Sequence, residues 1–247
     1  MRTGLRIEPG ENSRTQTEQS RLELQLKESL KADFEIPKTP LVALEIAAEK
    51  AESSSLKSLA ENLADRLDQV RQQLHQVGQD IVVTPAARAL QRRQMAEKVV
   101  KELTETADKA TQAVAAEIKS LETQLPSAQL PHVSESVALA YAQRIDRGEL
   151  RLHELFEGSS EEQAVALQLT ERYSRLLPET ERQPVADVKA QIDRSEPHKL
   201  QAIEERRKAI SALREMALKV SRLPETVAPE ELIEEIKSRS YSSRGAA

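Results

Sequence analysis

Residues 56–77 carry apolar side chains in a seven-residue repeat, and this pattern limits the fold more than any other feature of the sequence. The spacings between successive apolar positions are 4, 3, 4, 3, 4 and 3. This spacing places all of them on one face of an α-helix, which then has to be covered by another helix. The positions are Leu56, Ala60, Leu63, Leu67, Val70, Leu74 and Val77.

A second and longer helix is expected after a short connection. Thr84 can cap free backbone amides, and Pro85 suits the first helical position, where its missing N–H costs nothing. No Gly or Pro interrupts the chain from there to Leu125, and Pro126 ends the run, which gives a helix roughly 60 Å long. Its apolar stripe, which has an extra four-residue step at Val114, is Ala96, Val100, Leu103, Ala107, Ala110, Val114, Ile118, Leu121 and Leu125.

The connection between these two helices predicts how they are arranged. Gly78 is expected to end the first helix in the left-handed conformation. Long helices joined by so short a segment fold back on each other as an antiparallel hairpin. The predicted fold class is therefore all-α, with a long antiparallel, coiled-coil-like hairpin, a smaller multi-helix region after it, and extended arms at both ends.

Proline and glycine positions divide the chain into four predicted parts. Residues 1–40 are interpreted as an arm with one helix over about 16–33, and residues 41–126 as the hairpin. Residues 127–223 are the multi-helix region, in which Ser160 and Gln163 have the spacing of a capping box. Residues 224–247 are interpreted as a short helix to about residue 238 and a basic tail, because Lys237, Arg239 and Arg244 stand there without an acidic neighbour.

The multi-helix region also contains a possible repeat of about 46 residues. Ile145-Asp146-Arg147 recurs as Ile192-Asp193-Arg194, and the tetrapeptide Leu-Pro-Glu-Thr occurs at 177–180 and again at 223–226. A period of this length is typical of two-helix solenoid units. Short matches also arise by chance in helical proteins, so both interpretations stay open.

The composition favours close helix packing over a thick globular core. Only 2% of the residues are aromatic, so aliphatic side chains must form the core, and the absence of Cys excludes disulfides, thiolate catalysis and cysteine zinc sites. The net charge of −5 gives no general attraction to nucleic acid or to an anionic membrane. We expect no signal peptide and no transmembrane helix, because no apolar run approaches the roughly 18 residues that a span needs.

The sequence does not indicate an enzyme. The four histidines are far apart. Glu149 and His153 are four residues apart and share a helix face, but such a pair is more often a solvated pair than a site. No His-Glu-x-x-His, glycine-rich phosphate loop or Gly-x-Ser-x-Gly motif occurs. We therefore expect no catalytic residues, no metal and no cofactor.

Two basic clusters are candidates for phosphate contacts. Each has three cations close together in a predicted helix, and together they are Arg88, Arg92, Arg93, Arg206, Arg207 and Lys208. A phosphate-binding face is one interpretation. A solvated face held by salt bridges is the other, because acidic residues are interspersed and no aromatic side chains accompany the cations.

The function predicted from these features is structural: a non-enzymatic assembly or scaffold protein that forms a homo-oligomer or binds other proteins of an assembly. A phage or other virion component in the cytoplasm fits this description. A helical adaptor or regulator that binds nucleic acid or a nucleoprotein is the alternative. The expected helix-face residues, which can serve an intramolecular core or an intermolecular contact, are Leu56, Leu63, Leu67, Val70, Leu74, Val100, Leu103, Val114, Ile118 and Leu121.

Overall fold

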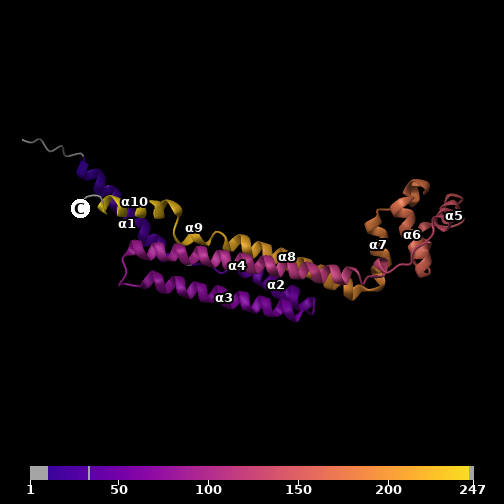
Figure 1. The fold of residues 1–247 in the computed structure, drawn as a ribbon, viewed down its shortest axis with the longest axis horizontal. Helices are drawn as coiled ribbons and strands as arrows, with labels where there is room; N and C mark the ends of the chain where they lie inside the picture. Colours follow the sequence, from indigo (N-terminus) through magenta and orange to yellow (C-terminus); the bar gives the residue numbers. More distant parts are fainter. Residues whose placement is uncertain (1–10, 33, 245–247) are drawn as a thin grey trace, which may run out of the picture. The chain divides into compact units, whose positions relative to one another are not determined.

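A computed structural model describes residues 11–32 and 34–244, and these residues form helices and short connections without a strand (Figure 1). The prediction of an all-helical protein is confirmed. The α-helices are α1 (Glu11–Lys31), α2 (Lys38–Lys50), α3 (Ser54–Gln79), α4 (Pro85–Glu122), α5 (Glu135–Asp146), α6 (Ser160–Arg172), α7 (Val185–Ile192), α8 (Pro197–Val220), α9 (Leu223–Val227) and α10 (Glu230–Arg244). Short 3₁₀ turns η1 (Pro126–Ala128), η2 (Leu152–Phe156), η3 (Ser174–Leu176), η4 (Glu179–Glu181) and η5 (Asp193–Ser195) connect some of them.

The chain divides into two compact units. Unit 1 consists of residues 1–45, 55–111 and 211–247, and unit 2 of residues 46–54 and 112–210. Each unit has an aliphatic core of its own. The four parts expected from the sequence remain a prediction about domain boundaries.

The buried face of α3 follows the heptad pattern closely. Six of its seven apolar positions are less than 3% exposed, and only Val77, at the end of the helix, is partly buried. Because a helix face repeats every seven residues, a regular apolar spacing in the sequence is enough to assign this face. The six buried residues are Leu56, Ala60, Leu63, Leu67, Val70 and Leu74.

The buried face of α4 differs from the expected stripe at three positions, and Ala110 is one of those that are only partly buried. Val99 is buried, whereas Val100, named from the sequence, is only partly buried, and so is Leu121. Ala96 and Leu103 are seven residues apart on the buried face. The buried residue between them can be the third or the fourth residue after Ala96, because both spacings stay on the same helix face. The sequence has Val at both places, so its pattern could not decide between them.

The expected role of Gly78 is wrong. Gly78 lies inside α3, which continues to Gln79, and Gly148 is the only described glycine with a positive φ. A Cβ atom at Gly78 would lie 3.1 Å from the carbonyl oxygen of Leu30. A side chain here would make a tight contact with the end of α1, which passes close to α3.

Both predicted arms contain more helix than the sequence suggested. The first arm forms α1 and then α2, which begins at Lys38, and α10 runs beyond residue 238 to Arg244. Residues 1–10 and 245–247 lie outside the described residues. Side chains of α1 and α10 share a buried cluster with the start of α4 in unit 1, and its fully buried members are Leu26, Ala89, Ala228, Leu232, Ile233 and Ile236.

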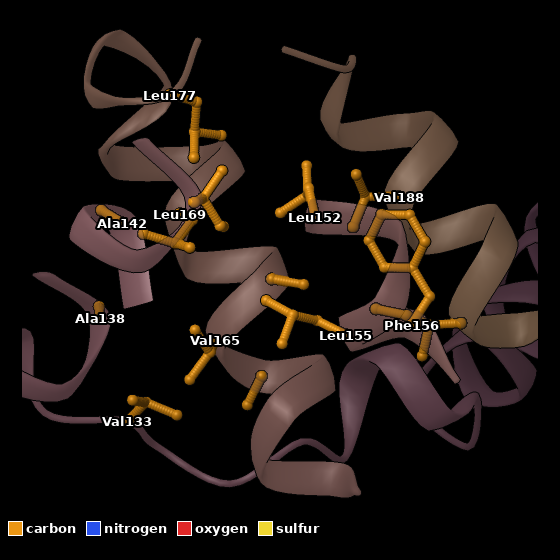
Figure 2. Close-up of a cluster of buried hydrophobic side chains, with 14 residues drawn as sticks. Val133, Ala138, Ala142, Leu152, Leu155, Phe156, Val165, Leu169, Leu177 and Val188 are labelled. Atoms are coloured by element: carbon orange, nitrogen blue, oxygen red, sulfur yellow. The ribbon is translucent and has the colours of Figure 1, made fainter. Parts of the chain in front are cut away.

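Unit 2 has a core of short helices and 3₁₀ turns, in which Phe156 packs with aliphatic side chains (Figure 2). The sequence placed a capping box at Ser160, but the structure forms it one residue earlier. The Ser159 N–H donates to the Glu162 carboxylate at 2.8 Å, and the Glu162 N–H donates to the Ser159 hydroxyl at 3.3 Å. Gln163 instead donates to the carbonyl oxygen of Phe156 at 2.9 Å.

A buried carboxylate in unit 2 bears on the proposed repeat. Asp193 is 4% exposed and accepts hydrogen bonds from the backbone N–H and the hydroxyl of Ser127, both at 2.8 Å. Asp146, its counterpart in the matching triplet, is exposed. The two triplets therefore lie in different environments, and a true repeat stays a prediction.

Candidate interaction sites and the two basic clusters

The three arginines near the start of α4 contact the ends of three other helices, all within unit 1. Arg88 donates to the carbonyl oxygen of Gly78, in the last turn of α3, at 2.7 Å. Arg92 donates to the carbonyl oxygens of Ser29 and Ala32, at the end of α1, both at 2.5 Å. Helix C-termini carry carbonyl groups without a helical donor and a partial negative charge, which a guanidinium satisfies well.

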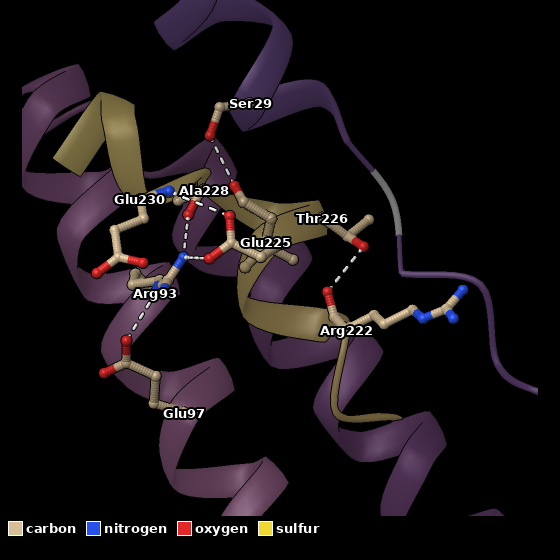
Figure 3. A network of polar contacts seen from close by, with 9 residues as sticks. Ser29, Arg93, Glu97, Arg222, Glu225, Thr226, Ala228 and Glu230 are labelled. Atoms are coloured by element: carbon tan, nitrogen blue, oxygen red, sulfur yellow. Dashed lines mark hydrogen bonds and ion pairs between the residues drawn. The ribbon is translucent and has the colours of Figure 1, made fainter. Parts of the chain in front are cut away.

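Arg93 holds the C-terminal segment in a similar way (Figure 3). Its guanidinium donates to the carbonyl oxygen of Ala228, which follows α9, at 2.9 Å, and to the carboxylates of Glu225 and Glu97 at 2.5 and 2.7 Å. The hydroxyl of Ser29 donates to the carbonyl oxygen of Val227 at 2.6 Å and joins α1 to α9. We call Arg88, Arg92 and Arg93 the arginine hub.

The protonation of this network follows from its hydrogen bonds. Burial lowers the pKa of Arg93, but hydrogen bonds to Glu97 and Glu225 outweigh that effect and leave the pKa above its usual value. The same hydrogen bond from Arg93 holds the pKa of the Glu225 carboxyl below its usual value. Both groups are thus more firmly charged in the folded protein than in a free chain.

The second basic cluster, in unit 2, contacts carboxylates. Arg206 pairs with Glu117 at 2.8 Å, and Arg207 pairs with Glu122 at 2.8 Å. Lys208 has two acidic neighbours on its own helix, at positions 204 and 205, at 3.0 and 2.9 Å. Hydrogen bonds to these two carboxylates raise the pKa of Lys208.

These contacts argue against a phosphate-binding face. Arg92 is 1% exposed, and the side chains of Arg93 and Arg206 are 14% and 13% exposed. A phosphate would have to displace carbonyl or carboxylate groups that already accept hydrogen bonds from these cations. The basic residues of both clusters thus already bond to groups of the same chain, although Arg207 and Lys208 remain more than half exposed.

The most exposed apolar residues of the described chain are not among the residues expected from the sequence. Ile81 and Val82, in the connection between α3 and α4, are 92% and 90% exposed. The backbone N–H of Val82 donates to a carboxylate oxygen of Asp80 at 2.9 Å, which gives the connection a turn. We call residues 80–82 the tip. Two adjacent β-branched residues in a helix connection were the available signal.

A groove also lies in unit 1, with a volume of about 990 Å³. Its apolar part comes from Phe34, Ile36 and Pro37, in the segment between α1 and α2. Charged side chains from α2, α3 and α8 lie at its edges. We call it the basic groove, because its charged lining residues are Lys38, Arg71 and Lys219 against Glu35 alone.

No group of three His, Asp or Glu side chains in the described part of the chain is arranged to hold a metal ion. His75, one of the four histidines, forms a ring hydrogen bond of 2.8 Å with Gln79. Within residues 11–32 and 34–244, no helix is both long enough and apolar enough to cross a bilayer. No family model matches the chain, and neither curated proteins nor solved structures give a significant match.

Proposed function

We propose that this protein is a non-enzymatic structural or assembly protein that acts through helix-mediated protein contacts. The observation that carries the proposal is the tip, where two adjacent β-branched side chains are about nine-tenths exposed. Exposed apolar side chains that stand together are typical of surfaces that bind another protein. The partners are copies of this chain, other proteins of an assembly, or both. The protein would serve as a scaffold or virion component in the cytoplasm.

We propose that α3 and α4 form an antiparallel, coiled-coil-like pair that carries the tip. The five-residue connection between Gln79 and Pro85, the buried heptad face of α3 and an ion pair of 2.7 Å between Arg66 and Glu102 support it. The hairpin would then serve as a support that presents the tip to a partner.

The alternative, a helical adaptor or regulator that binds nucleic acid, has less support. A nucleic-acid surface needs cations that face solvent and can contact phosphates. In this protein the arginine hub binds backbone carbonyls, and the second cluster binds carboxylates. Salt-dependent binding of a DNA or RNA oligonucleotide, lost on charge reversal at Arg207 and Lys208, would favour the alternative.

Light scattering after size exclusion tests the proposal on the full chain, at low and at high salt. We expect a defined oligomer at both salt concentrations, because apolar burial is not screened by ions. A monomer under both conditions would contradict self-assembly. An oligomer that dissociates in high salt would show that charge pairs, and not apolar contacts, hold it.

A single substitution tests the hairpin. Leu67 is fully buried on α3, and Leu67→Asp should reduce helicity or unfold unit 1, because it places a charge in an aliphatic core. Leu218→Asp is the matched control, since Leu218 is 59% exposed on α8. Unchanged circular dichroism and thermal unfolding for Leu67→Asp would remove Leu67 from any packed seam.

A further inference from the structure

The tip has a composition that suits a complementary site. Ile81 and Val82 present aliphatic side chains that are almost fully exposed, and Asp80 beside them is exposed and acidic. The tip therefore combines an apolar surface with a negative charge. A receptor for it should offer an apolar floor and basic edges.

The basic groove has that complementary composition on the same chain. Pro37 and Phe34 are buried and supply apolar surface, while Lys38 and Arg71 are exposed at its edges. Lys38 forms no ion pair with a described residue, and Arg71 contacts Asp68 only at 3.5 Å. A volume of about 990 Å³ is at the upper end of the range of roughly 300–1,000 Å³ usual for binding pockets, so two aliphatic side chains fit.

We propose that the tip of one copy inserts into the basic groove of a second copy, with Ile81 and Val82 on the apolar floor and Asp80 beside Lys38 and Arg71. This inference rests on the proposed assembly function and names its contact. Arg71 and His75, on the last turns of α3, line the groove, and the tip follows directly after α3 ends at Gln79. Because both surfaces adjoin the same end of α3, two copies can exchange tips reciprocally, as a two-fold dimer requires.

Two sets of substitutions test the contact by sedimentation equilibrium of the full chain. The tip variant is Ile81→Ser with Val82→Ser, and the groove variant is Lys38→Glu with Arg71→Glu. All four side chains are exposed in the single chain, so the substitutions should leave its fold intact. We expect the tip variant to raise the dimer dissociation constant about a hundredfold, because two aliphatic side chains lose their buried surface.

The groove variant should weaken the dimer about tenfold, because it sets like charges against Asp80. Adding Asp80→Lys to the groove variant should recover most of the loss, since opposite charges then meet again. The matched control, Lys101→Glu with Lys109→Glu, makes the same charge change at exposed positions of α4 and should leave the dimer unchanged. Circular dichroism of every variant checks that the helices are intact.

Each outcome separates this contact from the broader proposal. A wild-type oligomer that both variants leave intact would overturn the tip–groove contact and leave self-assembly standing. A wild-type chain that stays monomeric at every concentration would overturn both. Loss of the dimer in the charge control as well as the groove variant would show an effect of net charge and would also overturn the contact.

Discussion

The two basic clusters look alike in sequence but are used in different ways. The arginine hub of unit 1 donates mainly to backbone carbonyls at the ends of helices, and Arg92 is almost fully buried. The cluster of unit 2 pairs mainly with carboxylates, and the Arg207 side chain is 65% exposed. Three neighbouring cations therefore do not define a role by themselves, because burial and the type of acceptor decide it.

The difference also shows how each unit is held together. A carbonyl at a helix end is a neutral acceptor, so its bond with a guanidinium survives in high salt and joins segments distant in sequence. A carboxylate at the surface gives an ion pair that water and salt weaken. Unit 1 should thus depend strongly on its basic residues, and unit 2 only slightly.

The largest effect is expected for Arg92→Ala. The substitution removes the donor to Ser29 and Ala32 and should lower the free energy of unfolding by about 3 kcal/mol, because buried acceptors lose charged hydrogen-bond donors. Urea unfolding monitored by circular dichroism measures it. Arg92→Lys keeps the charge but not the forked geometry, so it should restore only part of the loss.

A smaller effect is expected for Arg206→Ala in unit 2. Arg206 pairs with Glu117 at 2.8 Å and contacts the carbonyl oxygen of Ala51 at 3.5 Å, with 13% of the side chain exposed. We expect a loss of about 1 kcal/mol, because the pair is only partly buried and its carboxylate is still hydrated. A loss in urea unfolding equal to that of Arg92→Ala would contradict the contrast between the two clusters.

The sequence was informative where a long helix repeats one pattern. The seven-residue spacing on α3 identified its buried face from Leu56 to Leu74, and Thr84-Pro85 marked the start of α4 correctly. These signals are local, since spacing and capping depend on residues a few positions apart. All-helical structure could therefore be predicted before any tertiary contact was known.

Sequence reasoning failed where a distant segment decides the outcome. Gly78 was assigned to a helix end, but its role comes from the carbonyl of Leu30, and the acceptors of Arg92 lie about 60 residues earlier in the chain. The exposure of Ile81 and Val82 likewise depends on whether another element covers them. A local pattern can mark the tip as apolar, but it does not contain its exposure, and the partners of the arginine hub and the lining of the groove are likewise set by distant segments.

The ion pair between Arg93 and Glu225 should make the stability of the fold depend on pH, because Arg93 lowers the pKa of the Glu225 carboxyl. Because Arg93 holds the folded-state pKa of Glu225 below the usual 4.5, this pair stabilises the fold above pH 4.5 and ceases to do so as the pH falls through the lowered value. The gain is well under about 1 kcal/mol, since the Glu225 side chain is 56% exposed. Urea midpoints of wild type and Glu225→Gln should differ at pH 6 and converge near pH 3. Glu61→Gln, at an exposed site of α3, is the control and should show no such convergence.

The smallest effect is expected for Arg207→Ala, and its salt dependence completes the contrast between the clusters. The side chains of Arg207 and Glu122 are 65% and 43% exposed, so losing the pair should cost less than about 0.5 kcal/mol. That loss should vanish near 1 M salt, where the screening length is about 3 Å. The loss from Arg92→Ala should persist there, because its acceptors are uncharged carbonyls shielded from solvent. Urea unfolding of both variants at low and high salt measures the two behaviours together, and equal salt dependence would mean that the hub relies on carboxylates after all.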